Sequence, residues 1–278
     1  MDFQLLKVGH CYHPEAMVMK GHSWKSMEFP AIVGLFKHPN MGNVLFDTGY
    51  AKRFLDETKR FPNVLYRLLT PMHLCEKEGL VTQLQHQNIG VDDVDYIFIS
   101  HFHADHIAGL LDYPKATFIC SRHAFESFER RSGISALIKG YLKGLLPEDF
   151  LARVRFIEDC KSMTLDKSLH PFGSGYDVFN DGSLMAIELP GHSWGHYGLL
   201  SFGNGEVNFL IGDACWTEEA YTAGARPNRL TRIIMSSEDE YLSTLNKLSK
   251  LYGENKQINL IPSHCQKTFE AFNLCHQA

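Results

Sequence analysis

The stretch ISHFHADHIAGL (residues 99–110) places three histidines and one aspartate within six positions, between two apolar runs. His101 and His103 lie two residues apart, so in an extended segment their side chains point to the same side and can clamp one metal ion. Asp105 and His106 are expected to lie beyond a bend in the chain after His103, where they can reach a second ion. Because imidazole nitrogens and carboxylate oxygens are both zinc ligands, the stretch predicts a metal site.

Three later segments repeat the pattern of an apolar strand that ends in a histidine or an aspartate. They are SLMAIELPGH (183–192), VNFLIGDA (207–214) and INLIPSH (258–264). The first histidine cluster likewise follows VDYIFIS (94–100), a run of buried-strand length and composition. Loops at strand ends of open α/β sheets converge on ligands. Four such strand ends therefore predict one convergent site.

The candidate ligands are five histidines and two aspartates, enough to give each of two ions three or four protein ligands. They are His101, His103, Asp105, His106, His192, Asp213 and His264. A structural zinc site is closed, usually rich in cysteine and complete with four ligands, so this set favours an open, catalytic pair. A carboxylate can bridge two ions about 3.5–4 Å apart, and Asp213 is the natural candidate.

Other segments predict the surrounding elements. QLLKVGHCY (4–12), AIVGLFKH (31–38), NVLFDTG (43–49) and ATFIC (116–120) are expected to be strands. Residues 52–69 are expected to be helical with a break near Pro62, and a further helix is expected to start near Ser121. Apolar residues at helical spacing predict a helix over 134–146. Ser237 and Glu240 have the spacing of a capping box that opens another helix.

Composition and charge narrow the class of protein. The net charge of −5 and the lack of a Lys/Arg run argue against a nucleic-acid partner. The first residues lack the features of a signal peptide, and no segment is long and apolar enough to suggest a membrane span. The seven cysteines follow no spacing pattern, so we expect most of them to be free thiols in a reducing compartment. We expect a cytoplasmic protein with one domain over residues 1–278, as a monomer or a homodimer.

The motifs together resemble the metallo-β-lactamase superfamily. They are His-x-His-x-Asp-His (101–106), PGHSWGH (190–196), GDA (212–214), the late SH (263–264) and the early LFDTG (45–49). The resemblance implies an α/β (α+β) fold, a four-layer αββα sandwich of two mixed β-sheets flanked by helices. It implies that the metal site lies at one edge of the two packed sheets.

The resemblance also implies roles for the ligands. His101, His103 and His192 would hold the first metal, and Asp105, His106 and His264 the second, with Asp213 bridging. Asp47 would have a supporting role, and His196 is expected to support a ligand rather than to be one. The implied cofactors are two divalent ions, zinc first, with manganese, iron and cobalt as alternatives that such a site accepts.

Within the superfamily, the sequence is most similar to the quorum-quenching N-acyl-homoserine lactone lactonases. Redox diiron members generally carry glutamate where this chain has His103, and zinc β-lactamases lack the bridging aspartate. Only residues 265–278 follow His264, whereas glyoxalase II-like thioesterases carry a helical extension there. The similarity implies that the chain opens a lactone or ester ring by attack of a metal-bound hydroxide, which Asp105 orients.

Two departures from the lactonase pattern bear on the substrate. Where lactonases usually have a tyrosine three residues after the bridging aspartate, this chain has Trp216, and the last histidine lies in SHC rather than Gly-His-Asp. Trp216 is expected to polarise the substrate or to form a pocket wall that favours small or aromatic lactones. The expected catalytic residues are thus Asp105, Asp213 and Trp216. The roles of Cys215 and Cys265 stay open.

Alternative functions also stay open. The first is a thioester or phosphoester hydrolase of the same superfamily. The second is an oxidoreductase like the persulfide dioxygenases, which bind a single iron. The third is a metal-binding module without catalysis, which any metal-dependent turnover would exclude.

Overall fold

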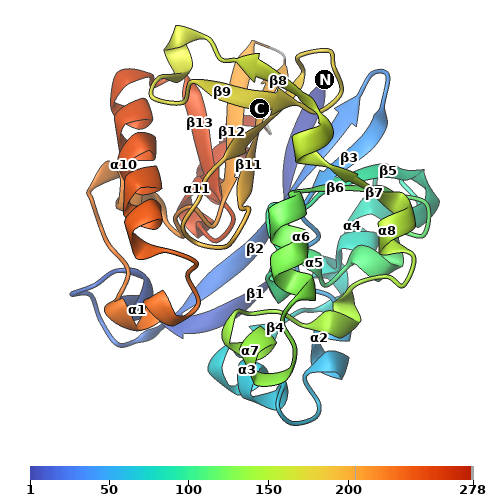
Figure 1. Ribbon diagram of the computed structural model, residues 1–278, viewed down its shortest axis with the longest axis vertical. Helices are drawn as coiled ribbons and strands as arrows, with labels where there is room; N and C mark the ends of the chain where they lie inside the picture. Colours follow the sequence, from blue (N-terminus) through green and yellow to red (C-terminus); the bar gives the residue numbers. More distant parts are fainter. Residues whose placement is uncertain (204, 277–278) are drawn as a thin grey trace.

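Two β-sheets packed against each other form the centre of the computed structural model, which describes residues 1–203 and 205–276 (Figure 1). Within these residues the first sheet has seven strands in the order β4-β1-β2-β3-β5-β6-β7. Its strands are β1 (Asp2–Pro14), β2 (Ser26–His38), β3 (Gly42–Phe46), β4 (Met72–His73), β5 (Val94–Phe98), β6 (Thr117–Cys120) and β7 (Val154–Phe156). Residues 204, 277 and 278 of the expected domain lie outside the described part.

The second sheet has six strands in the described residues, in the order β13-β12-β11-β10-β9-β8. They are β8 (Lys161–Thr164), β9 (Ser174–Asp177), β10 (Leu184–Glu188), β11 (Tyr197–Gly203), β12 (Glu206–Gly212) and β13 (Ile258–Pro262). Both sheets are mixed. Strands β3, β5, β6 and β7 run parallel to one another, whereas β1 and β2 are antiparallel, and in the second sheet β12 pairs with β13 in parallel.

Helices surround the two sheets, several of them on the outer faces (Figure 1), whereas the last helix (Gln266–His276) contacts strands of both sheets and contributes Phe272 to the apolar cluster between them. They are α1 (Glu15–Val18), α2 (Lys52–Glu57), α3 (Val64–Leu69), α4 (Leu80–Gln85), α5 (Ala104–Ile107), α6 (Arg122–Glu129), α7 (Gly133–Ile138), α8 (Phe150–Arg153), α9 (Glu218–Thr222), α10 (Glu238–Glu254) and α11 (Gln266–His276). Side chains of α2, α4, α6 and α8 share one apolar cluster with the first sheet, and α10 shares another with the second sheet. The expected four-layer arrangement is therefore confirmed.

The central strands are apolar throughout because their side chains alternate between two faces of the sheet that are both buried. Val44 and Phe46 of β3 face the second sheet, while Leu45 between them belongs to the cluster under the helices. Successive side chains of a strand point to opposite faces, and both faces of this sheet are covered. The runs of strand length before the candidate ligands are buried for the same reason, which fixes where each ligand emerges.

The prediction of one helix over 134–146 is wrong. Helix α7 ends at Ile138, and a separate 3-10 turn follows at Lys143–Leu145. Gly140 has a positive φ of 69°, which ends the helix and turns the chain. The apolar residues therefore do not share a face, since Leu142 is buried and Ile134 is exposed.

The other expected helices are confirmed. Residues 52–69 form α2 and α3 on either side of a break at Thr58–Asn63, which includes Pro62. Ser121 and Ser237 cap α6 and α10, each accepting a hydrogen bond from the backbone N–H three residues later. Across the described residues, no helix has both the length and the apolar character that crossing a membrane requires.

Candidate metal centre

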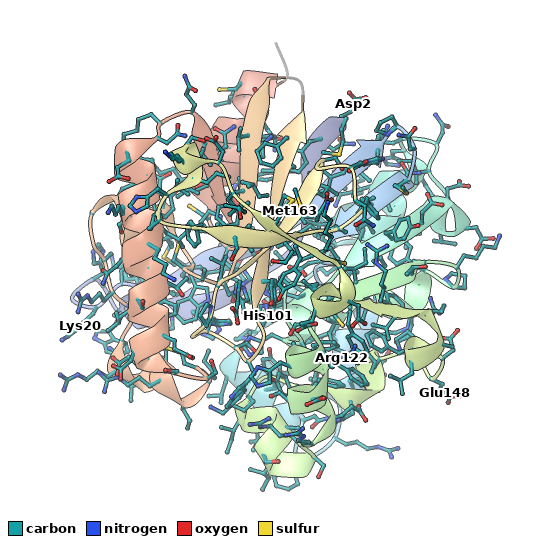
Figure 2. All side chains as sticks on the ribbon, turned by 45° about the horizontal axis from the view of Figure 1, so that its top comes forward. Asp2, Lys20, His101, Arg122, Glu148 and Met163 are labelled. Atoms are coloured by element: carbon teal, nitrogen blue, oxygen red, sulfur yellow. The ribbon has the colours of Figure 1, made fainter. Side chains whose placement is uncertain are left out.

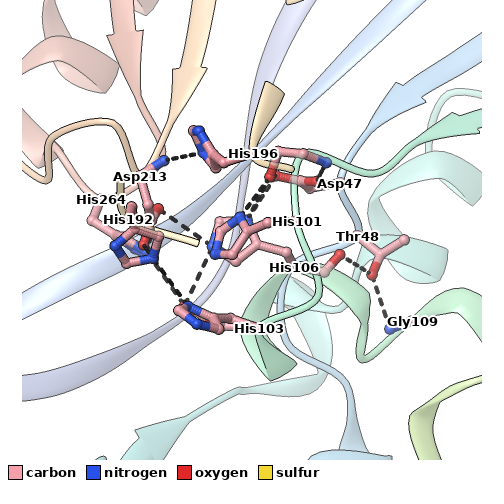
Figure 3. A network of polar contacts seen from close by, with 12 residues as sticks. Asp47, Thr48, His101, His103, His106, Gly109, His192, His196, Asp213 and His264 are labelled. Carbon is pink, nitrogen blue, oxygen red and sulfur yellow. Dashed lines mark hydrogen bonds and ion pairs between the residues drawn. The ribbon is translucent and has the colours of Figure 1, made fainter. Parts of the chain in front are cut away.

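Four strand ends meet at one edge of the two sheets. His101 follows β5, His192 follows β10, Asp213 follows β12 and His264 follows β13. His103 is the N-cap residue of the short helix α5, which carries Asp105 and His106. In the side-chain view His101 lies near the middle of the molecule (Figure 2). The close-up of one polar network labels His101, His103, His106, His192, Asp213 and His264 (Figure 3).

The first group consists of His101, His103, His192 and Asp213. Each of these buried residues offers one ligand atom, and the four atoms lie within 4.8 Å of one another. Nε2 of His192 is 3.0 Å from Nδ1 of His103 and 3.2 Å from Oδ2 of Asp213. The structure thus brings together the three histidines and the aspartate that were expected around the first ion.

The second group consists of Asp105, His106 and His264, whose ligand atoms also lie within 4.8 Å of one another. Nε2 of His264 is 3.3 Å from Oδ2 of Asp105, and Nε2 of His106 is 3.8 Å from the same oxygen. Asp105 is partly exposed, whereas the two histidines are buried. This group is therefore the more accessible of the two.

The carboxylate of Asp213 lies between the two groups. Its Oδ1 is 3.3 Å from Nε2 of His106 and 3.1 Å from Nε2 of His264. Its Oδ2 is the oxygen that lies near His192 in the first group. One carboxylate oxygen thus faces each group, which is the arrangement that a shared ligand of two ions requires.

The donor set fits metal ions. In the described part of the chain, Nε2 of His101 is buried and has no hydrogen-bond partner, while Nδ1 of His103 is the ring nitrogen that faces His192. Buried polar atoms are otherwise almost always paired, so such atoms pointing into a cluster of ligand-type side chains are open to a cation. The mixture of imidazole and carboxylate donors suits zinc and neighbouring transition metals.

The protonation states also suit metal binding in the first group. Burial, together with the neighbouring histidines, holds the pKa of His101 and of His103 well below the usual value, so both rings are neutral and keep a free lone pair. In the second group burial opposes the charged form of His106. The nearby carboxylates of Asp47, Asp105 and Asp213 outweigh burial and raise its pKa.

Comparison with known families agrees with the fold and the motifs. The family described as the metallo-beta-lactamase superfamily matches residues 30–251. This chain belongs to the metallo-β-lactamase superfamily. The resemblance inferred from the sequence is therefore confirmed.

Relatives of this metallo-β-lactamase chain include curated lactonases. The N-acyl homoserine lactonase AttM of Rhizobium radiobacter is 26% identical over 241 residues, which cover 85% of this chain and 82% of the relative. The AttM lactonase of Azorhizobium caulinodans is 26% identical over 246 residues, covering 88% of this chain and 85% of the relative.

Solved structures share the same metallo-β-lactamase fold. An N-acyl homoserine lactone hydrolase with the product N-hexanoyl-L-homoserine at its catalytic metal centre has a TM-score of 0.74 at 19% identity, over 97% of this chain and 95% of that chain. AidC, a dizinc quorum-quenching lactonase, has a TM-score of 0.66 at 16% identity, over 95% and 87%.

Contacts behind the candidate ligands of this superfamily member fix their orientation. The carboxylate of Asp47 accepts from the backbone N–H and hydroxyl of Ser100, both at 2.8 Å, and its Oδ2 lies 2.7 Å from Nδ1 of His106. The Ser100 hydroxyl lies 3.0 Å from Nδ1 of His101. Nδ1 of His264 lies 2.7 Å from the backbone oxygen of Pro30. Sequence reasoning named Asp47 but missed Ser100 and Pro30.

His196 lies behind Asp213. Its Nδ1 is 3.0 Å from the backbone oxygen of Leu189, and its Nε2 accepts a hydrogen bond from the backbone N–H of Asp213 at 3.1 Å. Burial lowers the pKa of His196 to about 3, so the ring is neutral, as an acceptor at Nε2 must be. Both nitrogens thus bond to backbone atoms rather than to the ligand atoms of the two groups.

Trp216 is buried beside Asp213, and its indole N–H donates to Oδ2 of Asp213 at 2.9 Å. An indole has one donor and no acceptor. The indole N–H of Trp216, which was expected to polarise a substrate carbonyl, therefore donates to the Asp213 carboxylate instead. Cys215 and Cys265 are also buried, and burial raises the pKa of the Cys215 thiol, as expected for a small packing residue.

Replacing Asp47 with asparagine should lower metal affinity or turnover by about 10- to 100-fold, the usual cost of changing a partner of a metal ligand. The amide keeps the shape of the side chain but offers His106 a neutral oxygen in place of a carboxylate. Zinc affinity and kcat/KM measured on the variant and the parent check this. An unchanged zinc affinity and turnover would mean that Asp47 only holds the turn after β3.

Proposed function

We propose that this chain is a dinuclear metal-dependent hydrolase that opens a lactone ring, with N-acyl homoserine lactones as the first substrate class to test. The observation that carries the proposal is the position of Asp213, whose two oxygens face two separate groups of histidines. The similarity to proteins named as N-acyl homoserine lactonases supports the choice of substrate class. We further propose that residues 1–278 act as one domain.

In this proposal the first ion is held by His101, His103 and His192, the second by Asp105, His106 and His264, and Asp213 is shared. Zinc is the proposed metal, with manganese, iron and cobalt as alternatives. When bound, two such ions lower the pKa of a coordinated water to about 7 and polarise an ester carbonyl.

The protein's own residues supply orientation and proton handling. The Asp105 side chain is 13% exposed against 4% for Asp213, so among the two carboxylates it is Asp105 that reaches the open side of the site. It can accept a hydrogen bond from the attacking water and hold that water in line with the carbonyl. Asp213 is enclosed by histidines and acts only as a shared ligand.

The second group favours this proposal over a persulfide dioxygenase-like oxidoreductase with one iron. A mononuclear site needs only the first group, which already offers four ligand atoms. Asp105, His106 and His264 would then have no ion to bind, although their ligand atoms lie within 4.8 Å of one another. A hydrolase with two ions uses all seven residues.

A pH-release screen of the zinc-loaded protein over lactones, thioesters and phosphodiesters tests the proposal. We expect ring opening of lactones to give the highest kcat/KM. Within the homoserine lactones we expect short acyl chains to be preferred, because the indole of Trp216 is larger than the phenol that lactonases usually carry at that position. Faster hydrolysis of a thioester or a phosphodiester than of every lactone would contradict the substrate class.

A further inference from the structure

The hydrogen bond from Trp216 goes to only one of the two carboxylate oxygens of Asp213. The indole N–H donates to Oδ2, the carboxylate oxygen that lies 3.2 Å from His192, and leaves Oδ1 to His106 and His264. Both partners are buried, so water does not compete strongly for the bond. The Trp216 ring is itself held by its edge-to-face contact with His192, at an interplanar angle of 88°.

Two contacts together fix Asp213. His196 accepts the backbone N–H of Asp213, which holds the main chain at the end of β12. The terminal torsion of an aspartate side chain is broad and roughly two-fold, so the backbone alone does not decide where each oxygen points. The indole N–H supplies that missing constraint, because a donor at a fixed position selects one rotation of the carboxylate.

We propose that Trp216 is the positioning residue of the metal pair: its N–H holds the Asp213 carboxylate with one oxygen toward each group of ligands, so that two ions share it. This inference rests on the proposed function only in assuming that two ions bind. It gives the N–H of Trp216 a role toward the metals in place of a hydrogen bond to the substrate, because the only donor of the indole is already used.

Trp216→Phe tests the proposal, since phenylalanine keeps an aromatic ring against His192 and removes the N–H. Trp194→Phe is the matched control. Trp194 lies two residues from His192, but its ring faces the cations of Arg131 and Lys139, at 4.0 and 5.1 Å from the ring centroid. Metal-free protein is titrated with Zn²⁺ against a competing chelator and with Co²⁺ while its visible absorption spectrum is recorded.

We expect Trp216→Phe to bind at least one of two ions about 10- to 100-fold more weakly than the parent, with an altered Co²⁺ spectrum. Trp194→Phe should keep both affinities and the parent spectrum. Equal affinities and spectra for parent and Trp216→Phe would overturn the proposal, and so would an equal loss in both variants. A parent that binds fewer than two ions would instead contradict the proposed function, so the two failures are distinguishable.

A measurement on the parent protein covers the case in which Trp216→Phe does not fold. The chain has three tryptophans, and each gives one indole signal in a ¹H–¹⁵N spectrum. Trp24→Phe and Trp194→Phe assign the other two signals, which leaves that of Trp216. We expect the Trp216 N–H to exchange slowly with solvent and to shift when Zn²⁺ is added. Fast exchange, or no shift on saturation with metal, would overturn the proposal.

Discussion

Replacing His106 with alanine should remove bound metal and lower hydrolysis by at least about 1,000-fold, because the nucleophilic water then loses most of the pKa shift from about 15.7 toward 7. Nε2 of His106 lies 3.3 Å from Oδ1 of Asp213, the carboxylate between the two groups. Nδ1 of His106 lies 2.7 Å from Oδ2 of Asp47. Metal content, kcat/KM and the circular dichroism spectrum of the variant check the loss of metal and activity and the retention of the fold.

Two other histidines serve as controls for this variant. His196→Ala should cost only about 10- to 100-fold, since His196 contacts the backbone of Asp213 rather than an ion. His123→Ala on helix α6 should change nothing, because His123 is exposed and belongs to neither group. If His196→Ala proves as damaging as His106→Ala, the proposed set of ligands is wrong.

Removing the metals should lower the melting temperature by roughly 8–16 °C. An ion present at about 1,000 times its Kd stabilises the folded state by about 4 kcal/mol. For a domain of this size each kcal/mol corresponds to a shift of roughly 2–4 °C. A second ion adds to this shift, so the range is a lower bound for a pair.

Calorimetry of the protein before chelation, after chelation and after reloading with Zn²⁺ measures this effect. Asp213→Ala is the matched control, because it lacks the shared carboxylate and should show a much smaller response to Zn²⁺. A parent protein that melts at the same temperature with and without metal would contradict a buried metal pair.

The sequence predicted the convergence of the site because each ligand lies directly after a short buried strand. The apolar runs before His101, His192, Asp213 and His264 are local signals, and strand ends in such folds share one edge. The order of the strands within each sheet did not follow from these signals, because pairing such as that of β12 with β13 joins segments far apart in the chain.

The contacts behind the ligands were harder to predict. A backbone oxygen such as that of Pro30, which lies next to Nδ1 of His264, leaves no trace in residue types. The side chain of Trp216 showed that a donor was present three residues after Asp213, but its direction depends on packing against His192. The helix expected over 134–146 failed because Gly140 outweighs a favourable apolar spacing.

Anomalous diffraction from crystals of the zinc-loaded protein, recorded above the zinc absorption edge, tests the central claim most directly. We expect two strong peaks about 3.5–4 Å apart, one among His101, His103 and His192 and the other beside His106, with the Asp213 carboxylate between them. A single fully occupied peak, with Asp105 and His264 turned away from it, would contradict the dinuclear site.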